Sequence, residues 1–190
     1  MKTWRRVDSR RIHSCRVFDL DRASFVPPEG GRPREYYVIE APDWINVIPL
    51  SDDGEVLMVR QYRFGIGALT LEIPGGMCDG LEEPAAAAAR ELAEETGFEA
   101  SSLTRLGWVY PNPPIQNNRC HTFLARGLSL GGPPRPDSDE RLELVRVRLD
   151  SVQGLIADGT IAHALVLAAF HLLHVAGGAH ARSAVSPPGP

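Results

Sequence analysis

The chain has 190 residues, enough for one substantial hydrophobic core and short for two, so we expect one main domain with a small appendage. Its formal net charge of −4 and hydrophobic content of 43% are those of an ordinary globular protein, with no global electrostatic footprint for a nucleic-acid partner. The cysteines are odd in number and widely spaced, which argues against a disulfide framework and a cysteine-rich zinc site: Cys15, Cys78 and Cys120.

The start of the chain is basic but does not read as a targeting segment. It has no apolar stretch followed by a small-residue cleavage site, and no apolar run elsewhere is long enough to span a bilayer. We therefore expect a cytoplasmic protein without a membrane partner.

Arginines gather near the start of the chain, and we expect a solvated or subunit-contact surface there rather than a nucleic-acid arm: Arg5, Arg6, Arg10, Arg11 and Arg16.

Residues 1–42 are predicted to form an N-terminal β extension. Short apolar, β-branched and aromatic runs alternate with turn signals, of which the run from Pro27 to Gly31 is the clearest. The predicted strands lie near 12–20 and 34–41, and they form an antiparallel sheet.

A second domain is predicted over residues 43–178. It opens with two strands, 44–50 and 55–62, that read as a hairpin around the turn at 51–54. One more short strand, 69–73, ends at Pro74 and the glycine pair that follows. Later strands fit residues 103–110, 119–128 and 142–149, a second helix fits 160–175, and a disordered tail is expected at 179–190.

A helix is predicted from about Glu83 to Gly97. Pro84 stands at a first-turn position where a missing N–H costs nothing, and Gly97 suits a left-handed C-cap. Its small apolar stripe would let the helix lie close against a sheet: Ala85, Ala88, Ala89, Leu92 and Thr96.

Carboxylates crowd one face of this helix. Glu91, Glu94 and Glu95 fall within an arc of about 100°, opposite much of the alanine stripe. Like charges at such separations destabilise a helix by roughly 0.2–0.5 kcal/mol per pair, so the grouping either is fully solvated or has a function. A hard divalent cation gives it one, and Mg²⁺, with Mn²⁺ as a substitute, is the expected cofactor.

Neighbouring residues fit a metal site better than a solvated helix face. Arg90 can pair with Glu82 or Glu91 and so hold the carboxylates in position. The pair Gly75–Gly76 lets the backbone approach a metal or phosphate where a side chain would obstruct it.

The whole segment resembles the Nudix box at every defining position. The residues that carry the resemblance are Gly76, Glu82, Arg90-Glu91-Leu92, Glu94-Glu95, Gly97 and Phe98. Over roughly residues 10–175 the chain is similar to the ADP-ribose pyrophosphatase branch, whose members typically carry a proline where Pro113 and Pro114 stand. The resemblance implies an α/β/α sandwich with a mixed sheet, an N-terminal antiparallel sheet exchanged or packed across a homodimer, and hydrolysis of a nucleotide sugar to nucleoside monophosphate and sugar phosphate.

The resemblance also implies roles for individual residues. Metal ligands fall on Glu91, Glu95 and the backbone carbonyl of Gly75, with Glu94 as a further ligand. Supporting positions fall on Gly76, Glu82, Arg90 and Gly97. An acidic residue on a late loop, as ligand or general base, best matches Glu140, with Asp137 and Asp139 as competitors; a box glutamate could equally be the base.

The loop at 110–121 supplies the predicted substrate contacts, although it could be an ordinary polar loop. Amides suit sugar hydroxyls and a guanidinium suits phosphate oxygens, which selects Asn112, Gln116, Asn118 and Arg119. Elsewhere, Arg63 is predicted to contact the pyrophosphate. Trp44 either stacks on a base or, by preference, packs in the core or at a dimer interface.

The predicted function is therefore Mg²⁺-dependent hydrolysis of a nucleotide sugar, with ADP-ribose or a relative such as GDP-mannose as the small-molecule partner. Two alternatives stay open. One is a Nudix-fold sensor that binds a nucleotide sugar without cutting it, and the other is a nucleoside triphosphate pyrophosphatase.

Overall fold

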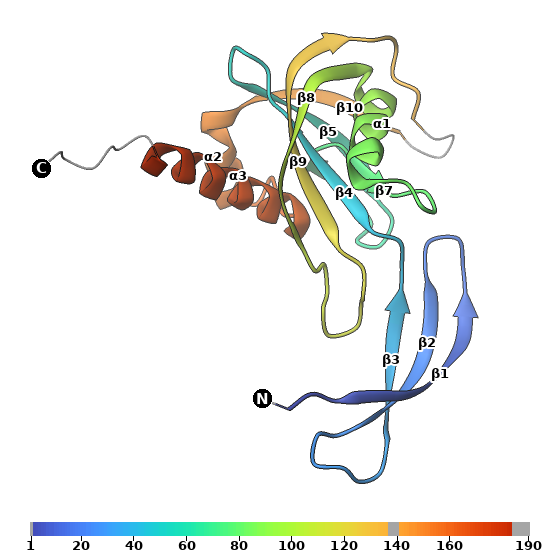
Figure 1. Ribbon diagram of the computed structural model, residues 1–190. Helices are drawn as coiled ribbons and strands as arrows, with labels where there is room; N and C mark the ends of the chain where they lie inside the picture. Colours follow the sequence, from blue (N-terminus) through green and yellow to red (C-terminus); the bar gives the residue numbers. More distant parts are fainter. Residues whose placement is uncertain (1, 137–140, 184–190) are drawn as a thin grey trace, which may run out of the picture. The chain divides into compact units, whose positions relative to one another are not determined.

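The computed structural model describes residues 2–136 and 141–183, with side chains described as far as residue 177 (Figure 1). The chain divides into two compact units. The first comprises residues 1–43 and 110–119, and the second comprises 44–109 and 120–190. The loop at 110–119, expected within the second domain, thus belongs to the same unit as the N-terminal strands.

The first unit is an antiparallel sheet of β1 (Arg5–Ser14), β2 (Asp19–Val26) and β3 (Arg34–Glu40), in the order β1-β2-β3. The sequence predicted one strand at 12–20, where the chain in fact turns between β1 and β2. That turn lacks the glycine or proline that marks most turns, and the Cys15 amide closes it by donating to the Phe18 carbonyl at 3.0 Å. The prediction was wrong because local sequence did not mark the turn.

Arginines of β1 are paired with acidic residues of the same unit. Arg6 contacts Asp21 and Glu40, and Arg11 contacts Asp19 and Asp21. The hydrogen bond from Arg11 holds the pKa of Asp21 below its ordinary value. These pairs reduce the positive charge that the N-terminal arginines would otherwise present.

The second unit contains two sheets. One is mixed, in the order β7-β4-β9-β8, with β4 parallel to β9 and the other pairs antiparallel. The other is antiparallel, in the order β10-β5-β6. Their strands are β4 (Trp44–Pro49), β5 (Glu55–Arg63), β6 (Ala68–Glu72), β7 (Gly75–Met77), β8 (Phe98–Val109), β9 (Cys120–Leu130) and β10 (Glu143–Arg148).

The predicted hairpin at 44–62 is only partly formed. The turn closes as expected, with the Ser51 amide donating to the Glu55 carbonyl at 2.9 Å. Beyond an isolated bridge between Leu50 and Val56, however, β4 and β5 enter different sheets. Both strands are buried over most of their length. Each strand therefore pairs with other strands of its own sheet and is packed on both faces.

Helices cover both faces of the mixed sheet, as Figure 1 shows, and complete the expected α/β/α sandwich. On one side, α1 (Pro84–Thr96) packs Ala87, Ala88 and Leu92 against Ile45 and Val47. On the other, α3 (Ala164–Ser183) packs against the second apolar cluster, which includes Ile48, Val56, Met58, Val166 and Phe170.

The boundaries of α1 are those predicted. Pro84 occupies the first turn, and Gly97 ends the helix in the left-handed region with φ 75°. The buried face is rotated from the predicted stripe, since Ala85 and Ala89 are exposed and Ala87 is buried. Glu95 is buried on the same face, so the carboxylates border the packed side of the helix instead of lying opposite it.

The C-terminal helical region differs from the prediction in extent. A 3-10 turn (Leu149–Ser151) and a short helix, α2 (Val152–Ala157), precede α3 and had no clear periodic signal. The main helix begins at Ala164 and extends to Ser183, so the first residues of the expected tail are helical and residues 184–190 lie outside the described part. Among described residues, no helix is long and apolar enough to cross a membrane.

Candidate active site

The site is built where β7 meets α1. Strand β7 pairs with β4, placing Gly75 opposite Asn46 and Gly76 opposite Ile45. A Cβ on Gly76 would collide with the carboxylate of Glu91, and one on Gly75 would collide with the Ile45 carbonyl. Only glycines allow this close approach, so the pair fixes how near the helix carboxylates lie to the strand.

Two glutamates of α1 lie against this glycine pair. Glu95 is only 4% exposed, and its Oε2 accepts a hydrogen bond from the Gly75 amide at 3.2 Å. The Glu91 carboxylate lies beside Gly76 and is 14% exposed. Glu94, at 43% exposure, points more to solvent. The structure thus brings the predicted positions 75, 76, 91 and 95 together, with Glu94 at their edge.

Arg90 binds the surrounding carboxylates. Its guanidinium donates to both carboxylate oxygens of Glu82 at 3.1 and 2.9 Å, and to Glu91 and Glu94 at 2.9 Å each. A further hydrogen bond at 3.0 Å reaches the Met77 carbonyl. The sequence left Glu82 and Glu91 as alternative partners, and Arg90 pairs with both.

Charge in this cluster is tightly coupled. The hydrogen bonds with Glu82 are the main reason that the pKa of Arg90 lies above its ordinary value. The same contact lowers the pKa of the Glu82 carboxyl, although burial opposes the change. Because one guanidinium serves several carboxylates, the cluster keeps an excess of negative charge at neutral pH.

A second arginine–carboxylate pair lies on β5 and β6. Arg63 donates to Glu72 through Nε at 2.8 Å and Nη2 at 2.7 Å, and the Thr70 hydroxyl donates to the same carboxylate at 2.6 Å. Glu72 is 3% exposed and Arg63 is 43% exposed. Burial alone would raise the pKa of Glu72, but the bonds from Arg63 and Thr70 outweigh it and lower that pKa.

The predicted contacts from the loop at 110–119 belong to the first unit. The Asn118 amide is buried and donates to the Pro42 carbonyl at 3.0 Å, while the backbone amide of Arg119 donates to Asp43 at 2.7 Å. The Asn112 carbonyl accepts hydrogen bonds from the amides of Ile115 and Gln116. These contacts order the loop within its own unit, and the substrate roles of its side chains stay predictions.

Comparison with known proteins identifies the family to which this fold belongs. The family model of the NUDIX domain matches residues 42–170. The chain belongs to the Nudix hydrolase family. The predicted resemblance is thereby confirmed.

Relatives of this Nudix chain carry two kinds of name. An ADP-ribose pyrophosphatase of Bacillus subtilis is 32% identical over 151 residues, covering 79% of this chain and 81% of the relative. A methanol dehydrogenase activator of Bacillus methanolicus is 29% identical over 156 residues, covering 82% of this chain and 84% of that protein. A crystal structure of an ADP compounds hydrolase matches with a TM-score of 0.83 over 96% of this chain and 98% of that one; at 23% identity it supports the fold alone.

The carboxylates of the Nudix box fit a hard divalent cation. Within residues 2–136 and 141–177, no three carboxylate, imidazole or thiol side chains converge into a complete metal cage. Mg²⁺ needs no such cage, because it typically binds one or two carboxylates and keeps waters and substrate oxygens as its other ligands. Glu91 beside Gly76 and Glu95 beside Gly75, both recessed, have the required chemistry.

Glu140 and Trp44 are the remaining predicted site residues. Glu140, like its competitors Asp137 and Asp139, lies outside the described residues. Trp44 is half-buried on β4, where it pairs with Met77 on one side and Cys120 on the other.

Three polar residues near the site were not predicted from the sequence: Asn46, Glu72 and His163. Glu72 and Asn46 each stand in an apolar strand, where a buried polar side chain signals a specific partner. His163 precedes the apolar helix α3 and accepts from the Leu165 amide through Nδ1 at 3.2 Å, as an N-cap does. A polar residue directly before an apolar helical run was the available signal.

Proposed function

We propose that this Nudix protein hydrolyses the pyrophosphate bond of a nucleoside diphosphate sugar, giving a nucleoside monophosphate and a sugar phosphate. The observation that carries the proposal is the pair Glu91 and Glu95, recessed against Gly75–Gly76 within a cluster of excess negative charge. The relative named ADP-ribose pyrophosphatase makes ADP-ribose the first substrate to test, and GDP-mannose a second.

Glu91, Glu95 and the Gly75 carbonyl are the proposed ligands of Mg²⁺, with Mn²⁺ as a substitute and Glu94 as a further ligand. When bound, the ion would polarise phosphate oxygens, lower the pKa of a coordinated water and neutralise charge on the leaving group. Arg90 restricts the orientation of the Glu91 and Glu94 carboxylates by bonding both. The proton of the attacking water would pass to Glu94, the more exposed box carboxylate, or to Glu140.

Arg63 keeps its predicted role as a pyrophosphate contact, with part of its charge already engaged. Its Nε and Nη2 face Glu72, so much of its charge is matched by a buried carboxylate. We propose that it orients the substrate pyrophosphate through its half-exposed guanidinium. Arg119 with Asn112, Gln116 and Asn118 stays the proposed set of contacts from the first unit.

We propose that the chain works as a cytoplasmic homodimer without a nucleic-acid or membrane partner. The first unit exposes aromatic side chains on β3 and just before β1, with Trp4 41%, Tyr36 43% and Tyr37 57% exposed. Trp4 and Phe25 both pack edge-on to Tyr36, at 6.0 and 5.7 Å between ring centroids. Exposed aromatic groups of this kind are typical of protein interfaces. Light scattering of the wild type and of Tyr37→Glu tests this, since a monomeric wild type would contradict it.

The test of the reaction is product release from a panel of ADP-ribose, GDP-mannose, UDP-glucose, dinucleotides and nucleoside triphosphates, with Mg²⁺. Glu95→Gln is compared with Glu83→Gln, a matched change at an exposed residue that makes no side-chain cap bond to α1. We expect turnover of a nucleotide sugar that is lost in Glu95→Gln and kept in Glu83→Gln. Binding of a nucleotide sugar without turnover would reject the enzyme in favour of a sensor, and exclusive turnover of triphosphates would reject the substrate class.

A further inference from the structure

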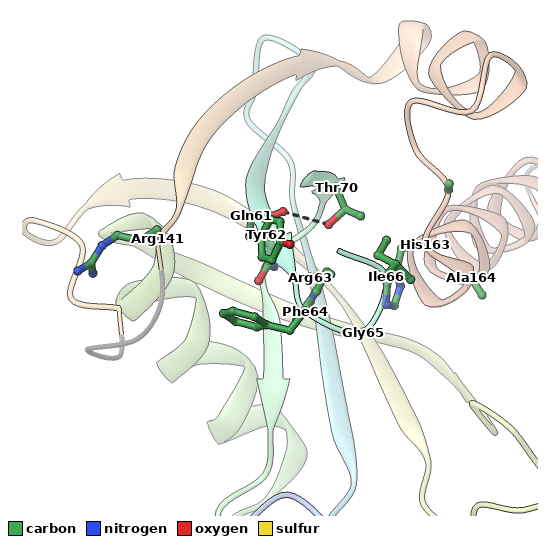
Figure 2. Close-up of a pocket in the computed structure, with 11 residues that line it drawn as sticks. Gln61, Tyr62, Arg63, Phe64, Gly65, Ile66, Thr70, Arg141, His163 and Ala164 are labelled. Carbon is green, nitrogen blue, oxygen red and sulfur yellow. Dashed lines mark hydrogen bonds between the residues drawn. The ribbon is translucent and has the colours of Figure 1, made fainter. Parts of the chain in front are cut away.

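A cavity of about 700 Å³ lies in the second unit, between the β5–β6 turn and the start of α3 (Figure 2). None of the box carboxylates lines it. Its wall includes Arg63, Phe64, Ile66 and Thr70 from the β5–β6 segment and His163 from the start of α3. A cavity of this size is within the range of small-molecule sites, which lie between about 300 and 1,000 Å³.

A short series of contacts joins this cavity to the proposed metal ligands. The Leu165 amide donates to His163, and the Leu165 carbonyl accepts from the Asn46 side chain at 3.2 Å. Asn46 is the strand partner of Gly75, whose amide bonds to Glu95. Arg63, the proposed pyrophosphate contact, also lines the cavity, so a substrate whose pyrophosphate meets Arg63 presents one of its halves to the cavity.

The cavity combines apolar and hydrogen-bonding surface. Tyr62 and Phe64 form an edge-on pair with centroids 5.3 Å apart, and Phe64 and Ile66 are 83% and 68% exposed. Arg63 supplies guanidinium surface beside them. Ligands for such a wall carry acceptor oxygens on one side and C–H groups on another, as a sugar phosphate does.

His163 has a fixed tautomer in this arrangement. Its Nδ1 accepts the Leu165 amide, so the proton of the neutral ring is on Nε2. Figure 2 shows the imidazole beside Ile66 at the cavity wall. The ring can therefore offer the cavity an N–H donor while its other nitrogen caps α3.

We infer that this cavity receives the sugar half of the substrate, and that His163 is a specificity-determining contact that donates from Nε2 to a sugar or phosphate oxygen. The inference rests on the proposed function, since it assigns a place to one half of a nucleotide sugar. It adds a recognition site that is separate from the box carboxylates.

The test compares His163→Asn with the wild type and with His174→Asn. Asparagine keeps a side-chain acceptor that can cap α3, but it is too short to present a donor to the cavity. His174 is exposed on α3, the helix that His163 caps, so His174→Asn is the matched control. Calorimetry with ribose 5-phosphate, ribose and inorganic phosphate measures binding without turnover and separates hydroxyl from phosphate recognition.

We expect His163→Asn to bind ribose 5-phosphate roughly tenfold more weakly and to raise KM for ADP-ribose by a similar factor, as for one lost hydrogen bond. His174→Asn should match the wild type in both. In the wild type, the imidazole NMR signals of His163, assigned by their loss in the variant, should shift when ribose 5-phosphate is added.

Two outcomes decide the matter. Unchanged His163 signals, together with equal affinity of wild type and His163→Asn for all three ligands, would overturn the inference even if nucleotide sugars are hydrolysed. Ligand-induced shifts at His163 in a protein that hydrolyses no nucleotide sugar would support the cavity assignment and reject the proposed function alone.

Discussion

Two arginines of the second unit hold carboxylates in contrasting ways. Arg90 is shared by Glu82, Glu91 and Glu94, whereas Arg63 gives two parallel hydrogen bonds to one carboxylate, that of Glu72. The first cluster keeps excess negative charge, and the second is a matched pair whose carboxylate is buried. The comparison separates two arrangements of arginine with carboxylate: a guanidinium shared among several carboxylates suits the proposed cation site, and a buried carboxylate held by two parallel hydrogen bonds stabilises the fold.

Removing one carboxylate from the cluster around Arg90 should lower activity strongly with little cost in stability. Glu91→Gln deletes a proposed metal ligand, whose transition-state contribution is several kcal/mol, so kcat should fall roughly a thousandfold. Its unfolding temperature should not fall, because the change also relieves repulsion on α1. Steady-state hydrolysis of the preferred nucleotide sugar and thermal unfolding measure the two effects. A variant that retains wild-type kcat would remove Glu91 from the metal site.

Displacing that carboxylate without deleting it should have the next largest effect. Gly76→Ala puts a methyl group where the Glu91 carboxylate lies, so the carboxylate must shift by a substantial part of its own width. Misplacement of this order costs about a hundredfold in rate. Gly154→Ala is the matched control, because a Cβ there meets nothing within 4 Å. Equal kcat in both variants would mean that the glycine pair does not position Glu91.

The contrast between the two clusters also marks what sequence can and cannot predict. The bounds of helix α1 and the grouping of its carboxylates were predictable because Pro84, Gly97 and the 3.6-residue repeat act locally, whereas the face that packs was not. The partner of Arg63 was not, because Glu72 comes close only when β5 pairs with β6 in one register. The separation of β4 from β5 likewise depends on β9, a parallel partner more than 70 residues away.

The cavity side of the site shows the same limit. His163 and Asn46 are far apart in sequence and meet only through Leu165, once α3 lies on the sheet. No periodicity or motif brings them together, whereas the box is contained in a single strand, loop and helix. Local signals therefore gave the reaction class, and long-range packing supplied the residues that we propose surround the substrate.

Breaking the matched pair should affect stability more than chemistry. Glu72→Gln removes a buried carboxylate that accepts two hydrogen bonds from Arg63. We expect the free energy of unfolding to fall by about 2 kcal/mol at neutral pH. The loss is smaller than for a fully buried pair because Arg63 is half-exposed. Because the pKa of Glu72 is lowered on folding, its contribution is complete above the ordinary value of 4.5 and is lost as pH falls through the folded value.

Urea unfolding of wild type and Glu72→Gln between pH 7 and pH 3 checks this dependence. The stability difference should be constant near neutral pH and shrink below about pH 4.5. A difference that grows on acidification would show that Glu72 is protonated in the folded protein.

Replacing Arg90 by lysine gives the smallest and most diagnostic effect. Lysine keeps the positive charge but, as a compact ammonium, cannot bridge Glu82, Glu91 and Glu94 at once. Residues that orient metal ligands typically contribute 10- to 100-fold, and with charge conserved we expect the lower end, about tenfold in kcat/KM at limiting Mg²⁺. Since the loss lies in how the carboxylates are held, raising the Mg²⁺ concentration should restore much of the activity.

Arg60→Lys, at an exposed pair with Glu143, is the control and should leave the Mg²⁺ dependence unchanged. A loss in Arg90→Lys that no Mg²⁺ concentration reverses would mean that Arg90 acts on the substrate itself. Arg90 would then differ from Arg63 by taking part in catalysis, and not by the way in which it holds carboxylates.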